Sequence, residues 1–199
     1  MHEHYQNIQA QADPQELPAV RRDKRAHGNI PENFDLRQEL YRVTGVDLTA
    51  IDGIHVLTAQ TVMAEVGSDM SRFPTEAQFV SFLDLAPRNK ISGGKVVGRE
   101  KRKTKNRAGL ALRFAAGTLL ESETYLGAQY RRLRTKLGSP KARKAMGNKL
   151  TRIVYRMLRY GEEYVDRGKE FYEEKYRNIQ IRMLVKKANA LGLQIVEAA

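Results

Sequence analysis

The sequence predicts an all-α fold. Apolar residues recur at three- and four-residue spacing through most of the chain after Phe34, which is the period of helices packed on a core. Glycines and prolines interrupt these stretches at positions where helices would end. No stretch alternates apolar and polar residues with comparable strength. The expected architecture is a helix-hairpin-helix-like unit followed by long antiparallel helices, with a glycine-rich basic loop between them.

Residues 1–33 are predicted to be an extension of a helical domain formed by residues 34–199. His2–Ala12 has the pattern of a short polar helix that starts without a capping residue, as the end of a longer helix would. Asp13–Asn33 contains three prolines and a run of basic residues. Because proline breaks helices, this second stretch is expected to be a flexible basic linker.

Residues 46–67 resemble a helix-hairpin-helix. A helix over Asp35–Val43 is expected to end at Gly45, and a short helix, a tight turn at Gly53 and a second helix follow. In such units the backbone N–H groups of the turn bind a DNA phosphate. The usual hairpin has a second glycine where this chain has His55, so two interpretations remain open: phosphate binding, or a turn that only packs two helices.

The next segment combines a capped helix with a charged loop. Thr75 and Gln78 form a candidate capping box that opens a helix over Glu76–Leu85. Residues 86–104 contain three glycines and many charges, which predicts a loop or an irregular hairpin.

Residues 105–192 are expected to form a helical bundle. One long helix is predicted over Lys105–Leu137, because its apolar stripe continues throughout. A break at Gly138–Pro140 follows, and two more helices are predicted over Lys141–Tyr164 and Lys169–Leu191.

The charge of the chain is large and unevenly distributed. Lysine and arginine number 35 against 23 acids, a formal net charge of +12. Ala86–Arg113 holds ten basic residues and one acid, and Arg131–Arg159 holds eleven and none. Concentrated basic blocks suit a surface that follows phosphates, because each neutralised phosphate releases counterions. The alternative is a solvated helix face, which usually mixes both signs. DNA or RNA is therefore the expected class of partner.

Other classes of protein fit the sequence poorly. No apolar run approaches the roughly 20 residues that span a bilayer, and the N-terminus lacks the order of a signal peptide. With no cysteine there is neither a disulfide nor a thiolate metal site, which fits a reducing cytoplasm. The four histidines and the scattered aspartates have no metal-ligand spacing, so no metal site is expected in this chain.

Ser92 is the candidate catalytic residue. It lies in the stretch Ile91-Ser92-Gly93-Gly94-Lys95 inside the first basic block. Glycines let a backbone approach a phosphate closely, and cationic side chains stabilise the charge on a phosphodiester under attack. Serine is a weak nucleophile that needs activation, and a serine beside glycines is more often a turn residue.

From about Phe34 onward the chain resembles the C-terminal domain of the IS-one-ten type of insertion-sequence transposases, also called bridge-RNA-guided serine recombinases. The resemblance depends on several motifs in the right order. They are Leu48-Thr49-Ala50-Ile51-Asp52-Gly53-Ile54, Ala64-Glu65-Val66-Gly67, Ser71-Arg72-Phe73, Asp84-Leu85-Ala86-Pro87, Ile91-Ser92-Gly93-Gly94-Lys95, Lys103-Thr104-Lys105-Asn106-Arg107-Ala108 and Ala111-Leu112-Arg113.

This resemblance implies a function in DNA transposition and recombination. In that family the serine matched by Ser92 attacks the DNA backbone and forms a transient phosphoseryl–DNA link. The family also has an N-terminal RNase-H-type domain with metal-binding carboxylates, joined by a coiled coil, and a structured guide RNA. Residues 1–33 fit only the end of that coiled coil and a linker, so we expect the acidic domain to be missing, any Mg²⁺ to be bound only by that domain, and the isolated chain to be inactive.

The residues expected to bind nucleic acid surround Ser92 or precede it. Arg107 and Arg113 lie six positions apart on one helix and should point to different sides. The full set is Lys90, Gly93, Gly94, Lys95, Arg99, Lys101, Arg102, Lys103, Lys105, Arg107, Arg113 and Gly53.

Three functional hypotheses remain open. The first is a serine transposase domain that acts with an acidic domain in trans. The second is a non-catalytic nucleic-acid-binding remnant or regulator of a full-length transposase. The third is a basic RNA-binding protein unrelated to transposition. The expected partners are DNA, a structured guide RNA and a second copy or a full-length transposase, in the nucleoid-associated cytoplasm of a prokaryote and not at a membrane.

Overall fold

The computed structural model describes residues 8–19, 34–87, 89–99 and 106–195, and this part of the chain is mainly helical. The prediction of a helical fold is confirmed. The α-helices are α2 (Leu36–Thr44), α3 (Val56–Val66), α4 (Glu76–Phe82), α5 (Arg107–Thr118), α6 (Tyr125–Leu137), α7 (Ser139–Tyr160) and α8 (Gly168–Ala190). Short 3₁₀ helices are η1 (Pro14–Glu16), η2 (Leu48–Ala50), η3 (Met70–Arg72) and η4 (Leu119–Glu121). Two strands, β1 (Asn89–Ser92) and β2 (Lys95–Arg99), separate α4 from α5.

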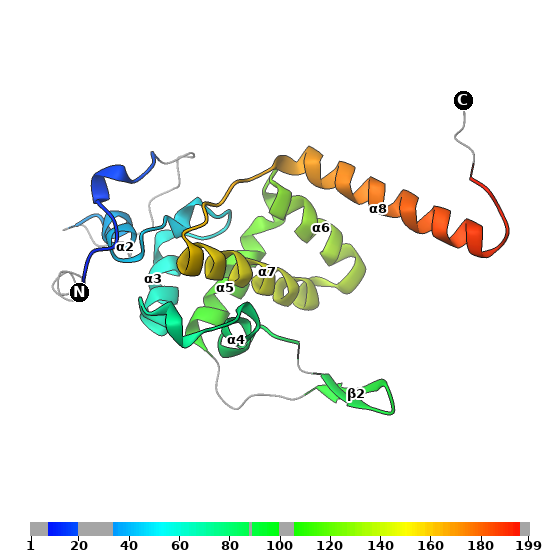
Figure 1. Cartoon of the computed structure of the whole chain (residues 1–199), viewed down its shortest axis with the longest axis horizontal. Coiled ribbons are helices and arrows are strands. Elements are labelled where there is room, and N and C mark those ends of the chain that lie inside the picture. Colours follow the sequence, from blue (N-terminus) through cyan, green and yellow to red (C-terminus); the bar gives the residue numbers. More distant parts are fainter. Residues whose placement is uncertain (1–7, 20–33, 88, 100–105, 196–199) are drawn as a thin grey trace.

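Helix α7 is the central element of the core. It crosses the middle of the helical body and packs against α4, α5 and α6, while α5 also packs against α3 (Figure 1). The contact surfaces combine aliphatic side chains with buried rings such as Phe79 and Tyr155, and Val62, Leu112 and Leu150 are completely buried. Removing such side chains from water supplies the main favourable free energy of the fold.

Helix ends follow the local sequence. Gln78 N donates to the Thr75 hydroxyl at 3.3 Å, and the Gln78 side chain accepts from Thr75 N at 3.1 Å, so the predicted capping box is confirmed. Gly45 ends α2 in the left-handed conformation, as predicted.

The single helix predicted over Lys105–Leu137 is wrong, because the chain breaks at η4. The Thr124 hydroxyl accepts a hydrogen bond from Gly127 N and starts α6 as a new helix. Gly127 leaves room for the carbonyl of Ser122, which occupies the space a Cβ would need. The apolar stripe continues through the break because Leu119 and Leu126 both remain buried.

The glycine-rich segment forms an antiparallel β-hairpin. Asn89 pairs with Arg99 and Ser92 pairs with Lys95, with a register irregularity after Lys90. The turn is Gly93-Gly94, and both residues have positive φ angles of 55° and 74°. Two consecutive positive φ angles are those of a tight two-residue hairpin turn, which glycine adopts without strain. The hairpin projects away from the helical body (Figure 1).

The N-terminal residues lie against α2. Ile8–Ala12 contain bends and no helix, in contrast to the short helix predicted for His2–Ala12, whose first residues are outside the described part. Gln11 N donates to the carbonyl of Arg42 at 2.7 Å, and the Arg42 guanidinium donates to the carbonyl of Ile8 at 3.1 Å. Hydrogen bonds to α2 thus replace those of a local helix.

Helix α8 lies beside α6 and contributes no buried residue. Tyr172 packs edge-on against Tyr125, with ring centroids 5.0 Å apart, and the Arg132 guanidinium lies over the ring of Tyr176. Farther along, Ile181 and Met183 are exposed. None of the helices in the described residues is long and apolar enough to cross a membrane.

Candidate nucleic-acid interface

Ser92 is the last residue of β1 and directly precedes the Gly93-Gly94 turn. Its side chain is exposed, and every residue of β1 is exposed. Added Cβ atoms at the two turn glycines would meet open space within 4 Å. A large substrate therefore has steric access to the hydroxyl.

Lys95 is the cross-strand partner of Ser92. Side chains of directly paired residues lie on the same face of a hairpin, so the Lys95 ammonium accompanies the Ser92 hydroxyl. Lys90 and Lys95 are both exposed. The described surroundings of Ser92 thus supply positive charge, which attracts a phosphodiester and stabilises negative charge on its oxygens.

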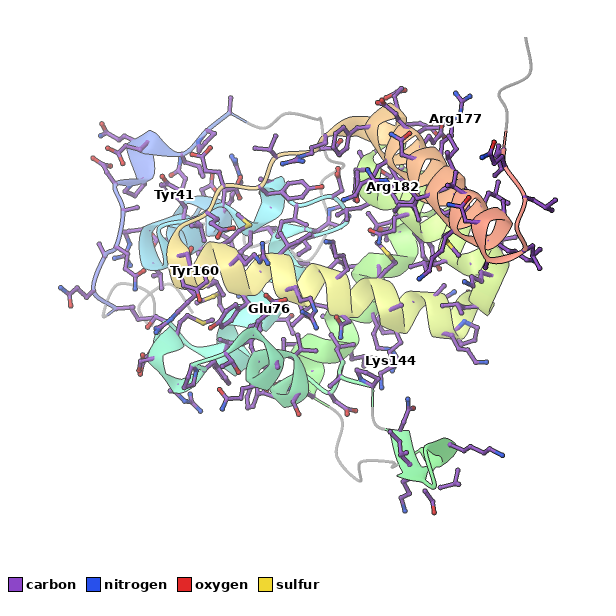
Figure 2. The ribbon with its side chains drawn as sticks, turned by 45° about the vertical axis from the view of Figure 1, so that its right-hand side comes forward. Tyr41, Glu76, Lys144, Tyr160, Arg177 and Arg182 are labelled. Carbon is purple, nitrogen blue, oxygen red and sulfur yellow. The ribbon has the colours of Figure 1, made fainter. Side chains whose placement is uncertain are left out.

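The root of the hairpin adjoins a groove that carries the second basic block. Leu85 is buried, and its carbonyl accepts a 3.1 Å hydrogen bond from the Asn148 side chain of α7. A cavity of about 420 Å³ lies here; its lining consists of Leu85, Pro87, Asn89, Leu137, Lys141, Lys144, Ala145 and Asn148. Figure 2 shows Lys144 on the side of α7 that is nearer the hairpin. Sequence reasoning missed this proximity, because the groove joins segments about 50 residues apart along the chain.

The two arginines of α5 point to different sides, as predicted. The Arg107 guanidinium pairs with Glu65 of α3, with Nε and Oε1 2.6 Å apart. Arg113 lies on the opposite flank, where its stem contacts α7 at Gly147. Leu85 contacts the same point, which places Arg113 on the side of the hairpin root.

Several cations of the second basic block have partners within the protein. Arg131 donates to the carbonyls of Leu120 and Ser122 at 3.1 and 2.7 Å, which holds the break before α6. Arg152 pairs with Glu76 of α4 at 2.6 Å. Lys149 is half-buried, and burial together with the nearby Arg156 and Lys175 lowers its pKa. These side chains contribute to the fold as well as to the charge.

The backbone of Gly53 packs against another part of the protein. Its φ angle is +83°, and a Cβ there would lie 2.7 Å from the Ala115 carbonyl oxygen of α5. The turn therefore presses directly on the end of α5, while Ile51 and Ile54 on either side are buried. This geometry favours the interpretation of a packing turn.

The remaining predicted residues are only partly described. Lys101, Arg102, Lys103 and Lys105 lie outside the described residues, as does the side chain of Arg99. Among the described residues, no three His, Asp or Glu side chains come together as a metal site would require.

Comparison with known families bears on the same segment. Residues 46–132 match the family described as "Transposase IS116/IS110/IS902 family". The match supports a relationship between this part of the chain and that transposase family. No curated protein matches the chain. The transposase match begins before the Gly53 turn and ends within α6, so it includes the whole hairpin with Ser92. The match supports transposition as the broad function, with DNA as the corresponding class of partner.

Proposed function

We propose that this chain engages the DNA backbone during transposition and that Ser92 is the nucleophile. The observation that supports this most directly is the presentation of Ser92 at the projecting end of a basic hairpin, with Lys95 across from it. Lys141, which is exposed, and the half-buried Lys144 of the adjoining groove extend the positive surface from the hairpin onto α7. The resemblance of the serine loop to that of the serine recombinases supports nucleophilic attack by Ser92 on the DNA backbone.

In the proposed step the Ser92 oxygen forms a bond to a backbone phosphorus. The bond from that phosphorus to one sugar oxygen breaks, so the serine carries one DNA end as a phosphodiester. The serine proton passes to a base and the departing sugar oxygen takes up a proton. Lys95 stabilises the extra negative charge on the phosphoryl oxygens in the transition state.

We propose that the base and any Mg²⁺ come from a carboxylate-bearing domain that acts together with the described residues. Serine needs such activation at neutral pH, and lysine ammonium groups do not provide it. A structured guide RNA and a second copy or a full-length relative complete the proposed set of partners.

A covalent-adduct assay tests the proposal. The chain is mixed with labelled element-junction DNA and candidate guide RNA, with or without a separately made acidic domain and Mg²⁺, and resolved on denaturing gels. We expect a shifted band in the complete mixture that disappears in Ser92→Ala and persists in Ser68→Ala, since Ser68 is another exposed serine outside the hairpin. Mass spectrometry of the digested band should find the DNA remnant on Ser92.

The second candidate function is a non-catalytic DNA-binding module. The groove beside the hairpin root supports it, because lysines bind phosphates whether or not a nucleophile acts. Equal DNA affinity of wild type and Ser92→Ala, with no adduct while a full-length relative forms one in parallel, would favour this candidate and exclude the nucleophile.

A further inference from the structure

We propose that Arg113 of α5 and Arg143 of α7 form a two-arginine phosphate clamp beside the hairpin. Resting on the proposed DNA-binding function, this inference names a contact that fixes the backbone next to Ser92. The ligand is the phosphodiester backbone itself, whatever its base sequence.

The two arginines are related by a reciprocal packing arrangement. The Cγ of Arg113 lies 3.3 Å from where a Cβ on Gly147 would stand, and the Nε of Arg143 lies 3.7 Å from the corresponding point on Gly117. Arg113 and Gly117 are one turn apart on α5, and Arg143 and Gly147 are one turn apart on α7. The helices therefore run antiparallel, and each arginine crosses the shared seam over a glycine of the opposite helix.

This arrangement holds the lower part of each arginine side chain against the opposite helix while its guanidinium stays accessible. A Cβ on Gly147 would crowd the Arg113 stem, and the Arg143 side chain lies at ordinary contact distance from the corresponding point on Gly117. Packing against the opposite helix limits the rotamers available to both side chains. Both arginines are nevertheless exposed. Their Cα atoms are about one helical turn, roughly 6 Å, apart along the seam. Two long side chains from these points can converge on one phosphate or on two adjacent ones.

Neither arginine has a partner among the described residues, whereas neighbouring arginines do. Arg107 pairs with Glu65, Arg131 with two carbonyls, and Arg152 with Glu76. Two cations that share one seam without a carboxylate repel each other. A bound phosphate removes this repulsion and accepts the paired N–H donors that a guanidinium presents.

The clamp lies on the side of the hairpin root. The Leu85 side chain comes within 3.3 Å of the same point on Gly147 that Arg113 contacts, and Leu85 also lines the basic groove. Lys144, which follows Arg143 in α7, lines that groove with Asn89 of β1. Leu85 therefore joins the Arg113 side of the seam to the groove, so a DNA backbone held at Arg113 would pass Leu85 on its way to Ser92.

The salt dependence of binding provides the test. Binding of a labelled DNA duplex is measured by fluorescence anisotropy at several salt concentrations for wild type, Arg113→Gln, Arg143→Gln and the double variant. The matched control is Arg182→Gln, which removes the same charge from the exposed surface of α8. Circular dichroism melts establish that each variant folds, and an RNA duplex in parallel distinguishes DNA from RNA as the source of the phosphates.

We expect each clamp variant to reduce the slope of log affinity against log salt by about one unit, and the control to leave it nearly unchanged. Arg113→Lys should retain the slope but bind more weakly, because lysine keeps the charge and loses the two-pronged geometry. Equal slopes for wild type and both clamp variants would overturn the clamp, as would an equal drop for the control Arg182→Gln.

The two proposals fail in different ways. A Ser92-dependent adduct with unchanged salt slopes would remove the clamp and keep the nucleophile. Reduced slopes without an adduct in the complete mixture would keep the clamp and remove the nucleophile.

Discussion

The side-chain amide of Asn148 donates a hydrogen bond of 3.1 Å to the main-chain carbonyl of Leu85, across 63 residues of sequence. Asn148 lies on the central helix α7, and Leu85 is the buried residue from which the chain leaves for the hairpin. This bond ties the hairpin root to the central helix of the core. The direction in which Ser92 is presented therefore depends on α7.

Replacing Asn148 with alanine should loosen the hairpin without unfolding the protein. One hydrogen bond of this kind contributes about 0.5–1.5 kcal/mol, so the melting temperature should fall by only a few degrees. DNA affinity and adduct formation should fall more than stability does, because the bond orients the site. The control is Asn178→Ala on the exposed surface of α8. Equal effects of the two substitutions on adduct formation would show that Asn148 has no orienting role.

Gly53→Ala should destabilise the whole fold. The left-handed backbone costs a residue with a Cβ about 1–2 kcal/mol, and contact with the Ala115 carbonyl adds to this. Gly93→Ala carries the backbone strain without a contact within 4 Å, so it should affect the hairpin alone. In urea unfolding, Gly53→Ala should lower the free energy of unfolding and Gly93→Ala should leave it nearly unchanged. If Gly53→Ala instead retains wild-type stability and loses DNA affinity, the turn binds phosphate.

Tyr155→Phe should lower the free energy of unfolding by about 1–3 kcal/mol, because it leaves a buried carbonyl without its donor. The Tyr155 hydroxyl donates to the Phe73 carbonyl at 3.0 Å, and the residue is only 1% exposed. Burial and the neighbouring Tyr160 raise the pKa of the phenol, so it remains a neutral donor at physiological pH. Denaturant titration gives the loss, and Tyr160→Phe on the exposed side is the control. Equal losses from the two changes would contradict this role of the buried bond.

The ion pair between Glu123 and Lys169 should help to hold α8 in place at neutral pH and should be lost in acid. The oxygen and nitrogen lie 2.9 Å apart, and the hydrogen bond from Lys169 lowers the pKa of Glu123 from its usual 4.5. A lowered carboxyl pKa gives stabilisation that is present above pH 4.5 and is lost as the pH falls through the lowered value. We expect the small difference in melting temperature between wild type and Glu123→Gln to vanish in acid. A difference that persists unchanged at pH 3 would contradict the assignment.

Local signals in the sequence predicted the helices and several of their ends. The capping box at Thr75 and the glycine after α2 each act through backbone hydrogen bonds within a few residues, so they can be read directly. The break before α6 also had a local signal in Thr124 and Gly127, but the apolar stripe continued across it. The two consecutive glycines Gly93 and Gly94 were also a local signal, because such a pair favours a tight hairpin turn. The glycines and many charges of the whole segment kept both a loop and an irregular hairpin open as predictions.

The candidate site was predictable only in part. Ser92 and its basic neighbours are contiguous in sequence, and the family match includes them. The pairing of Arg107 with Glu65 joins residues 42 positions apart. No local pattern distinguishes Arg107 from Arg113, which has no ion-pair partner within the described part of the chain. The use of Arg131 as a donor to main-chain carbonyls likewise depends on tertiary structure. Charge counts therefore identified the basic segments, but they did not show which of the cationic side chains remain available to bind phosphate.

Helix α8 contributes no residue to the core, although it has 23 residues and contacts α6. Its backbone hydrogen bonds can therefore open without exposing the buried cluster around α7. Amide hydrogen exchange should be faster throughout α8 than in α5 or α7, and little affected by denaturant, as expected for local rather than global opening. The protein would then consist of a cooperative core and a C-terminal helix of much lower local stability.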